Sequence, residues 1–293
     1  GFEAGKVTTG ASNTYVGHSA GKGASGADTG NVGVGTSALL SITSGENNIA
    51  VGHLALDALT DGDLHVAIGT SALSAYNGNA AVAIGREALR DLNNTGALGT
   101  IGIGQGAGAS LTSGGRNTAI GYQALGSATE LTHNIAIGWQ TMKDSSATTS
   151  HRNIGIGSFV MDSIGANVAN DNVAIGYNNL TALTTGDNNT VIGSQAGVNI
   201  NSGGNNTLMG VSAGDGLTIG ANNTVIGKDA LIVEDVGNHS VAIGFAALNK
   251  QNSDSDNEVT GNTGVGGYAG YYNVTGTHNT LLGYEAGFGS STY

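Results

Sequence analysis

One short phrase, repeated along the whole chain, constrains the fold of this protein more than any other feature. Each copy ends in a glycine preceded by an aliphatic residue, as in NTAIG at 117–121 and NIAIG at 134–138. The sixteen anchor glycines lie 16 to 19 residues apart, with one interval of 22, and they are Gly17, Gly35, Gly52, Gly69, Gly85, Gly104, Gly121, Gly138, Gly157, Gly176, Gly193, Gly210, Gly227, Gly244, Gly266 and Gly283. Such spacing is typical of a solenoid, in which each repeat packs on its neighbours. We therefore predict a single repeat domain over residues 1–293.

The residues around each anchor predict a short β-strand. The position before the anchor is aliphatic in all sixteen copies, and the position two residues earlier is always Thr, Val or Ile. These β-branched types favour the pleated conformation, and residues at i and i+2 point to the same side of a strand. Ala follows three residues after the anchor in thirteen copies, and we expect it to return the chain to the interior. The sequence thus predicts an all-β parallel β-solenoid of about 16 repeats of 16–19 residues, with two short strands joined at a glycine corner in each turn.

The residue between the two β-favouring positions decides which surfaces of the strand are covered. It is Ala, Gly, Val, Leu or Tyr, and never Lys, Glu, Ser or Thr. A solvated strand face would carry such polar residues, so we expect cover on both faces. A coil this narrow has one interior, so we infer that identical subunits pack through this column, at Ala50, Ala67, Ala83, Ala119, Ala136, Ala174 and Ala242. The alternative is a monomeric solenoid with a dry, exposed face.

Asparagine occupies the position four residues before the anchor in twelve of the sixteen copies. Stacked asparagines can bond to one another and to the backbone of a tight corner. We therefore predict a structural asparagine ladder.

Composition and charge exclude several functional classes. The chain has 52 Gly and no Pro or Cys, so it can be neither collagen nor a disulfide or thiolate-metal protein. Nine Lys and Arg against 21 Asp and Glu give a net charge of -12, and the basic residues are scattered, so we expect no nucleic-acid partner. No apolar run reaches the roughly 18 to 20 residues that a membrane helix requires, so we expect no membrane insertion in this segment. GFEAG at 1–5 matches GYEAG at 283–287, and we expect the chain to be a segment of a longer one.

The repeated phrases NTAIG, NVAIG and NTVIG, each followed by x-x-A, resemble two families of repeats over the whole chain. They are similar to the head repeats of trimeric autotransporter adhesins and to the repeats of phage tail fibres that end in a self-cleaving chaperone domain. The resemblance implies a left-handed parallel β-roll, a homotrimer around one axis, and a role in attachment. Repeats here are longer than most adhesin-head repeats, which favours the tail-fibre branch.

Several residues could in principle carry chemistry. Acidic pairs that could serve in glycoside hydrolysis, which needs two carboxylates beside a sugar groove, are Asp61 with Asp63, Glu234 with Asp235, and Asp254, Asp256 and Glu258. Turns this short leave little room for such a groove. The NSDSDNE segment at 252–258 lacks known calcium spacings, and we interpret it as a solvated loop. His133, His239 and His278 occupy the same position of the repeat, five residues before the anchor, and we assign this position to a surface corner. We expect no catalytic residue, metal or cofactor.

Aromatic residues follow the anchor directly in several turns and are the candidate receptor contacts. Tyr122 and Trp139 belong to adjacent turns, where stacking would place their rings about 5 Å apart as a flat platform for a sugar. We name Tyr122, Trp139 and Tyr177 as candidate glycan-binding residues. The alternative interpretation is that these rings shield the edges of neighbouring turns.

Together these features predict a non-enzymatic, homotrimeric fibre or adhesin head, outside the cell, on a virion tail or a bacterial surface. Its partners would be copies of itself and a glycan or protein receptor on the host surface. The alternatives are a tailspike-like enzyme that degrades surface polysaccharide and an ice-binding solenoid. The latter would need a regular Thr or Asn array on an exposed face, and we expect the Thr column to be buried.

Overall fold

The computed structural model describes residues 1–7, 9–23, 27–94, 96–145, 150–164 and 168–289. The chain forms two compact units, Gly1–Thr149 and Ser150–Tyr293, and each is built of parallel β-strands. The first unit contains β1 (Thr14–Val16), β2 (Val32–Val34), β3 (Ile49–Val51), β4 (Val66–Ile68), β5 (Val82–Ile84), β6 (Ile101–Ile103), β7 (Thr118–Ile120) and β8 (Ile135–Ile137). The second contains β9 (Ile154–Ser158), β10 (Val173–Tyr177), β11 (Thr190–Ser194), β12 (Thr207–Met209), β13 (Thr224–Ile226), β14 (Val241–Ile243), β15 (Thr263–Val265) and β16 (Thr280–Leu282).

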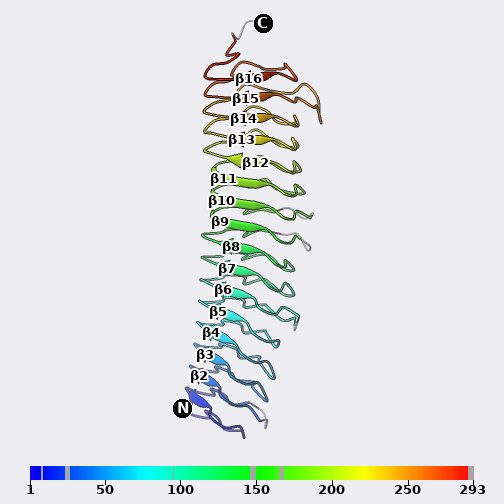
Figure 1. The fold of residues 1–293 in the computed structure, drawn as a ribbon. Coiled ribbons are helices and arrows are strands. Elements are labelled where there is room, and N and C mark those ends of the chain that lie inside the picture. The colour runs from blue at the N-terminus through cyan, green and yellow to red at the C-terminus, as the bar shows by residue number, and fades with distance from the viewer. Residues whose placement is uncertain (8, 24–26, 95, 146–149, 165–167, 290–293) are drawn as a thin grey trace. The chain divides into compact units, whose positions relative to one another are not determined.

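Within each unit, every strand pairs in parallel with the strand of the next turn (Figure 1). Equivalent residues lie opposite one another, as Ala119 does to Ala136 between β7 and β8. The all-β parallel solenoid predicted from the repeat is confirmed in both units, with sixteen strands among the described residues.

The prediction of two strands in each turn was wrong, because each turn holds one strand, which ends before the anchor or, in β9, β10 and β11, one residue after it. After the anchor the chain turns, and the residues at the second and fourth positions have positive φ, as at Gln123 (52°) and Leu125 (52°). Residues in the left-handed region cannot continue a pleated strand. The alanine between these positions nevertheless enters the core as expected, and Ala124 and Ala196 are fully buried.

The middle residue of the strand faces the interior of the chain's own solenoid, which corrects our assignment of a subunit interface. The alanines named for that interface are all fully buried within one chain: Ala50, Ala67, Ala83, Ala119, Ala136, Ala174 and Ala242. The first and third residues of every strand point outward instead and remain partly or fully exposed, as at Ile49 and Val51. The Thr residues of the first column, expected to be buried, therefore lie on the outer face. Alanine is favoured in the middle because the narrow interior has little space there.

Two side chains of each turn fill the interior: the middle residue of the strand and the residue four positions after the anchor. Their sizes are related. Where the middle residue is Ala, the later position is Leu or Met, as in Ala119 and Leu125, and both are fully buried. Where the middle residue is Tyr or Leu, the later position is Gly, as in Leu208 and Gly214, whereas a middle Val occurs with either Gly197 or Leu231. A Cβ on Gly214 would lie only 3.0 Å from Leu208 Cδ2. The two positions therefore share one volume of the core.

The predicted asparagine ladder is confirmed in both units. In the second unit, the Asn189 and Asn206 backbone N–H groups donate to Oδ1 of the preceding asparagine, Asn172 and Asn189 respectively, over 3.0 Å. The Asn189 Nδ2 donates to the Gly203 carbonyl over 2.9 Å. These side chains are fully buried, so the ladder satisfies backbone groups that water cannot reach.

The anchor position requires glycine for two reasons. Gly121 has a φ of 130°, a value that side chains disfavour. A Cβ there would also lie 2.2 Å from the carbonyl oxygen of Gly138, the anchor of the next turn. Stacked anchors thus allow the backbones of successive turns to approach closely.

Candidate functional site

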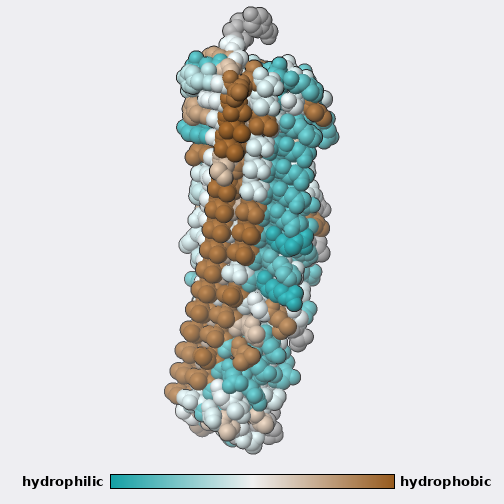
Figure 2. All heavy atoms as spheres, viewed as in Figure 1, coloured by the Kyte–Doolittle hydropathy of each residue, from teal (hydrophilic) through white to brown (hydrophobic). Residues whose placement is uncertain are grey.

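The outer face of the strands forms an apolar surface, which we call the aliphatic stripe: the first and third residues of each strand. In the first unit, fourteen of these sixteen residues are Val or Ile, and the other two are Thr14 and Thr118. Val16 and Ile49 are 54% and 41% exposed. Figure 2 shows the stripe as columns of hydrophobic residues that cross successive strands. The second unit carries the same two columns, with more Thr.

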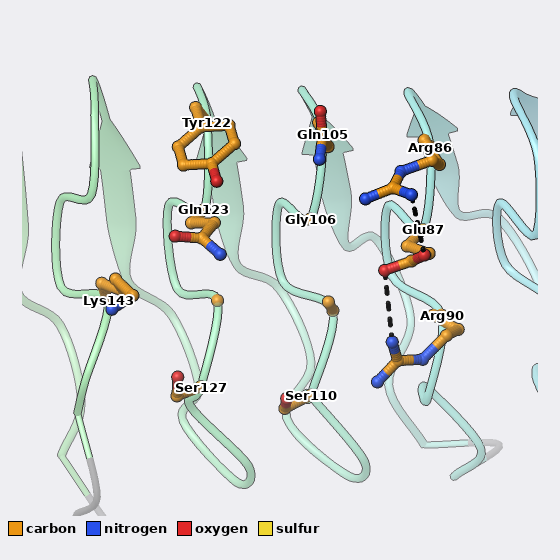
Figure 3. Close-up of a pocket in the computed structure, with 12 residues that line it drawn as sticks. Arg86, Glu87, Arg90, Gln105, Gly106, Ser110, Tyr122, Gln123, Ser127 and Lys143 are labelled. Carbon is orange, nitrogen blue, oxygen red and sulfur yellow. Dashed lines mark hydrogen bonds and ion pairs between the residues drawn. The ribbon is translucent and has the colours of Figure 1, made fainter.

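A groove on the first unit is the second candidate site, and its shape follows from one column of the repeat. Five residues after the anchor, four successive turns carry Arg90, Ala109, Gly126 and Lys143. The two small residues leave a hollow between the two long ones (Figure 3). Its volume is about 320 Å³, within the range of small-molecule sites.

The walls of the groove come from the other columns after the anchor. The full lining is Arg86, Glu87, Arg90, Gln105, Gly106, Ala109, Ser110, Tyr122, Gln123, Gly126, Ser127 and Lys143. It thus combines amide, hydroxyl, charged and aromatic side chains over an almost featureless floor of Gly and Ala. Three of the nine basic residues of the chain lie on this one surface, beside a single acidic lining residue.

Acidic neighbours hold the basic side chains of the groove in place. Arg90 makes a two-pronged contact with Asp91 at 2.8 and 2.6 Å, and this hydrogen bonding raises the pKa of Arg90. Glu87 lies between the two arginines, with its oxygens 3.7 Å from Arg86 Nη1 and 3.4 Å from Arg90 Nη1. The Lys143 Nζ lies 3.3 Å from Asp144. The arginines are therefore oriented along the edge of the groove (Figure 3).

The Tyr122 and Trp139 rings are brought together as the repeat spacing predicted. Their centroids are 4.2 Å apart and their planes differ by 20°. Rings this close are stacked face to face, so the expectation of a flat two-ring platform was wrong: each ring covers one face of the other. Tyr122 lines the groove, and Trp139 is 49% exposed beside it.

Tyr177 lies in the second unit, and its ring packs against Phe159 at 6.2 Å in an edge-to-face arrangement. Sequence reasoning missed a larger aromatic cluster in that unit. Its members are Phe245, Tyr268, Tyr271, Tyr272, Tyr284 and Phe288. A hollow of about 280 Å³ opens beside Phe245, Tyr268 and Tyr271. The signal was present, because the residues after Gly244, Gly266 and Gly283 carry rings within one or two positions.

The acidic candidates serve structural roles or face solvent. Asp63 accepts a hydrogen bond from the Glu46 backbone N–H over 2.7 Å. Glu234 is fully buried, where its Oε1 accepts from the Gly237 N–H at 2.8 Å and its Oε2 from Gln251 Nε2 at 2.9 Å. Asp254 and Asp256 lie exposed in their loop.

The histidine column His133, His239 and His278 is exposed, which confirms its placement at a surface corner. Within the described ranges, no three His, Asp or Glu side chains gather closely enough to hold a metal ion. The same ranges contain no helix with the length and hydrophobicity to span a bilayer.

Comparison with known proteins gives no assignment: no family model, curated protein or solved structure matches this chain. Function is therefore inferred from the two surfaces.

Proposed function

We propose that this protein is a non-enzymatic attachment protein, in which three copies pack through their aliphatic stripes. It would act outside the cell, as part of a virion tail fibre or of a bacterial surface adhesin. The single observation that carries the proposal is the stripe itself: columns of Val, Ile and Thr with one Met and one Leu, uncharged at every position, on the outside of the chain.

An apolar surface of this length is rarely left in water by a monomeric protein. Its partner must be apolar, uncharged and repeated at the spacing of parallel strands, about 4.8 Å. A second copy of the chain meets all three conditions, because it carries the same stripe at the same spacing. Closed symmetry around an axis then buries the stripe of every copy.

The resemblance of the NTAIG-type phrases to adhesin-head and tail-fibre repeats supports the same arrangement, with left-handed winding and three chains. Repeated turns suit attachment because length is gained by adding turns, each supported by its neighbours. Three copies would also present any ligand site three times, which raises avidity.

The mass of the particle in solution tests the proposal. By light scattering at micromolar concentration, we expect three times the chain mass of 28.8 kDa. The variants Ile49→Lys and Ile68→Lys place a charge on the stripe, at residues that are 41% and 39% exposed in one chain. We expect them to fold and to run as single chains, because a lysine desolvated in the interface is unfavourable.

Thr70→Lys is the matched control, since Thr70 is exposed and lies outside the stripe. We expect it to keep the mass of the unmodified protein. A single-chain mass for the unmodified protein, or an unchanged mass for both stripe variants, would refute the proposal.

The alternatives are tested separately. A tailspike-like hydrolase needs two carboxylates across a groove, whereas the groove and the hollow beside Phe245 each have one acidic lining residue, Glu87 and Asp229. Incubation with capsular polysaccharide, followed by viscosity, checks this activity.

The outward position of Thr190, Thr207 and Thr224 in three successive turns favours ice binding as a second candidate function. The third column of these strands is Ile or Met, so the array is half apolar. Thermal hysteresis measured on the purified protein would establish or reject it.

A further inference from the structure

The groove of the first unit has the form of a site for an elongated ligand. Its lining comes from four successive turns, those that follow β5, β6, β7 and β8. Three strand spacings separate the first turn from the last, so the groove extends about 14 Å along the stacking direction. Arg90 and Lys143 stand at its two ends, and the Gly and Ala floor lets a ligand approach the backbone (Figure 3).

The neutral side chains of the groove suit hydroxyl groups. Gln105 and Gln123 come shortly after the anchors of two adjacent turns. Ser110 and Ser127 each lie six residues after the same two anchors, lower in the groove (Figure 3). The Gln123 Oε1 accepts from Gln140 Nε2 over 3.0 Å, which fixes the amide and directs its own N–H groups elsewhere. Ser127 donates to Asp144 over 3.1 Å, so its oxygen can accept from a ligand. Such alternating donors and acceptors match the hydroxyls of a sugar.

The charges of the groove distinguish an acidic sugar from a neutral one. Arg86, Arg90 and Lys143 line the groove with one carboxylate, Glu87, while Asp91 and Asp144, which pair with Arg90 and Lys143, lie outside the lining. Arg86 is the most available cation, because its contact with Glu87 is long, 3.7 Å, and its side chain is 58% exposed. A planar guanidinium binds a carboxylate with two parallel hydrogen bonds.

We propose that this groove binds an anionic oligosaccharide, with Arg86 and Lys143 contacting acidic groups, the glutamines and serines contacting hydroxyls, and Tyr122 packing against a sugar ring. The biological role of this site, though not its binding chemistry, rests on the proposed attachment function. The ligand would be a polymer of acidic sugars on the target surface.

Trp139 gives a direct readout, because it is the only tryptophan of the chain and it stacks on Tyr122. Its fluorescence is titrated with trigalacturonate as the acidic probe, with neutral galactotriose, and with triglutamate as an anion that lacks sugar rings. We expect saturable binding of trigalacturonate, and binding of the other two probes weaker by about tenfold or more.

Three variants test the groove and one serves as its control. Arg86→Gln and Lys143→Gln each remove a charge from the surface of the groove, and we expect each to weaken trigalacturonate binding about tenfold. Ala109→Leu fills the floor without changing charge, and we expect it to abolish binding. Arg116→Gln makes the same charge change at an exposed residue outside the groove and should bind as the unmodified protein does.

Absence of saturable binding, equal binding of galactotriose or triglutamate, or an equal loss in Arg116→Gln would overturn the proposal. The particle mass of each variant is measured in parallel. If the unmodified protein has the trimer mass but does not bind trigalacturonate, only the glycan site is refuted. If it binds trigalacturonate but has the mass of a single chain, only the assembly is refuted.

Discussion

His65 shows how one residue can replace another when it reproduces the same hydrogen bonds. It stands in the asparagine column, is fully buried, and donates its backbone N–H to Asn48 Oδ1 over 3.0 Å. Its Nδ1 accepts from the Ala81 N–H at 3.1 Å, and its Nε2 lies 2.7 Å from the Gly78 carbonyl. Only the neutral ring with the proton on Nε2 satisfies both contacts.

This arrangement makes the stability of the first unit depend on pH. Burial lowers the pKa of His65 below its usual value of 6.5, although the bond to Gly78 and the charge of Asp63 oppose that shift. The unfolded chain therefore binds the proton more readily than the folded one. The contribution of His65 is complete above pH 6.5 and is lost as the pH falls below that value.

We predict that His65→Asn reduces this loss, because asparagine makes the same contacts in most other turns without titrating. Urea unfolding at pH 7.5 and pH 5.5 measures the change in free energy of unfolding for both proteins. His53→Asn is the control, since His53 is exposed, and it should behave as the unmodified protein does. An equal pH dependence in His65→Asn and the unmodified protein would contradict the assignment.

At the scale of one turn, the sequence predicted the strand and the ladder but reversed the two faces of the strand. The strand could be read from the β-branched columns, and the ladder from the asparagine column. The reversal arose because small apolar residues such as Ala119 suit either a close subunit contact or a crowded interior. The deciding signal was a correlation between positions, with Val225 and Leu231 as its exception: Gly21, Gly197, Gly214 and Gly287 follow the large middle residues Tyr15, Val191, Leu208 and Leu281.

That correlation predicts a compensating pair of substitutions in β7. Ala119→Leu should overpack the interior against Leu125 and lower the free energy of unfolding by about 1–3 kcal/mol. Leu125→Gly alone should leave a cavity and lower it by about 2–5 kcal/mol, less a small gain from glycine at positive φ. The double variant copies the Leu208 and Gly214 pairing, so we expect it to be more stable than the sum of the two losses.

Chemical denaturation of the four proteins gives the coupling energy directly. The pair Ile120→Leu with Leu125→Gly is the control, because Ile120 points outward and should not couple to Leu125. Additive losses for Ala119→Leu and Leu125→Gly would show that the two side chains do not share one volume.

The candidate site could be predicted only where it depends on spacing along the repeat. Adjacent turns placed Tyr122 against Trp139, but their face-to-face stacking depends on side-chain angles that spacing does not fix. The groove depends on what is missing from a column, namely long side chains at Ala109 and Gly126. Small residues between Arg90 and Lys143 are visible in the sequence, but their meaning requires knowing that this column faces outward.

At the scale of the whole molecule, the stripe links folding to association. A folded single chain leaves both outward columns in contact with water, and the assembled form would remove them from it. Burial of apolar surface contributes roughly 25 cal/mol per Å². Association should therefore stabilise the folded state, and mass action makes that stabilisation depend on protein concentration.

We predict that the melting temperature of the unmodified protein rises with concentration, by about 1–2 °C for each tenfold increase, given the large unfolding entropy of a chain of 293 residues. Ile49→Lys with Ile68→Lys should melt at a lower temperature that does not change with concentration, because the single chain has no association equilibrium to shift. Circular dichroism over a hundredfold range of concentration measures both values, and Thr70→Lys should follow the unmodified protein. A constant melting temperature for the unmodified protein, equal to that of the double variant, would mean that the stripe is stable in water without a partner and that its residues serve only the strand.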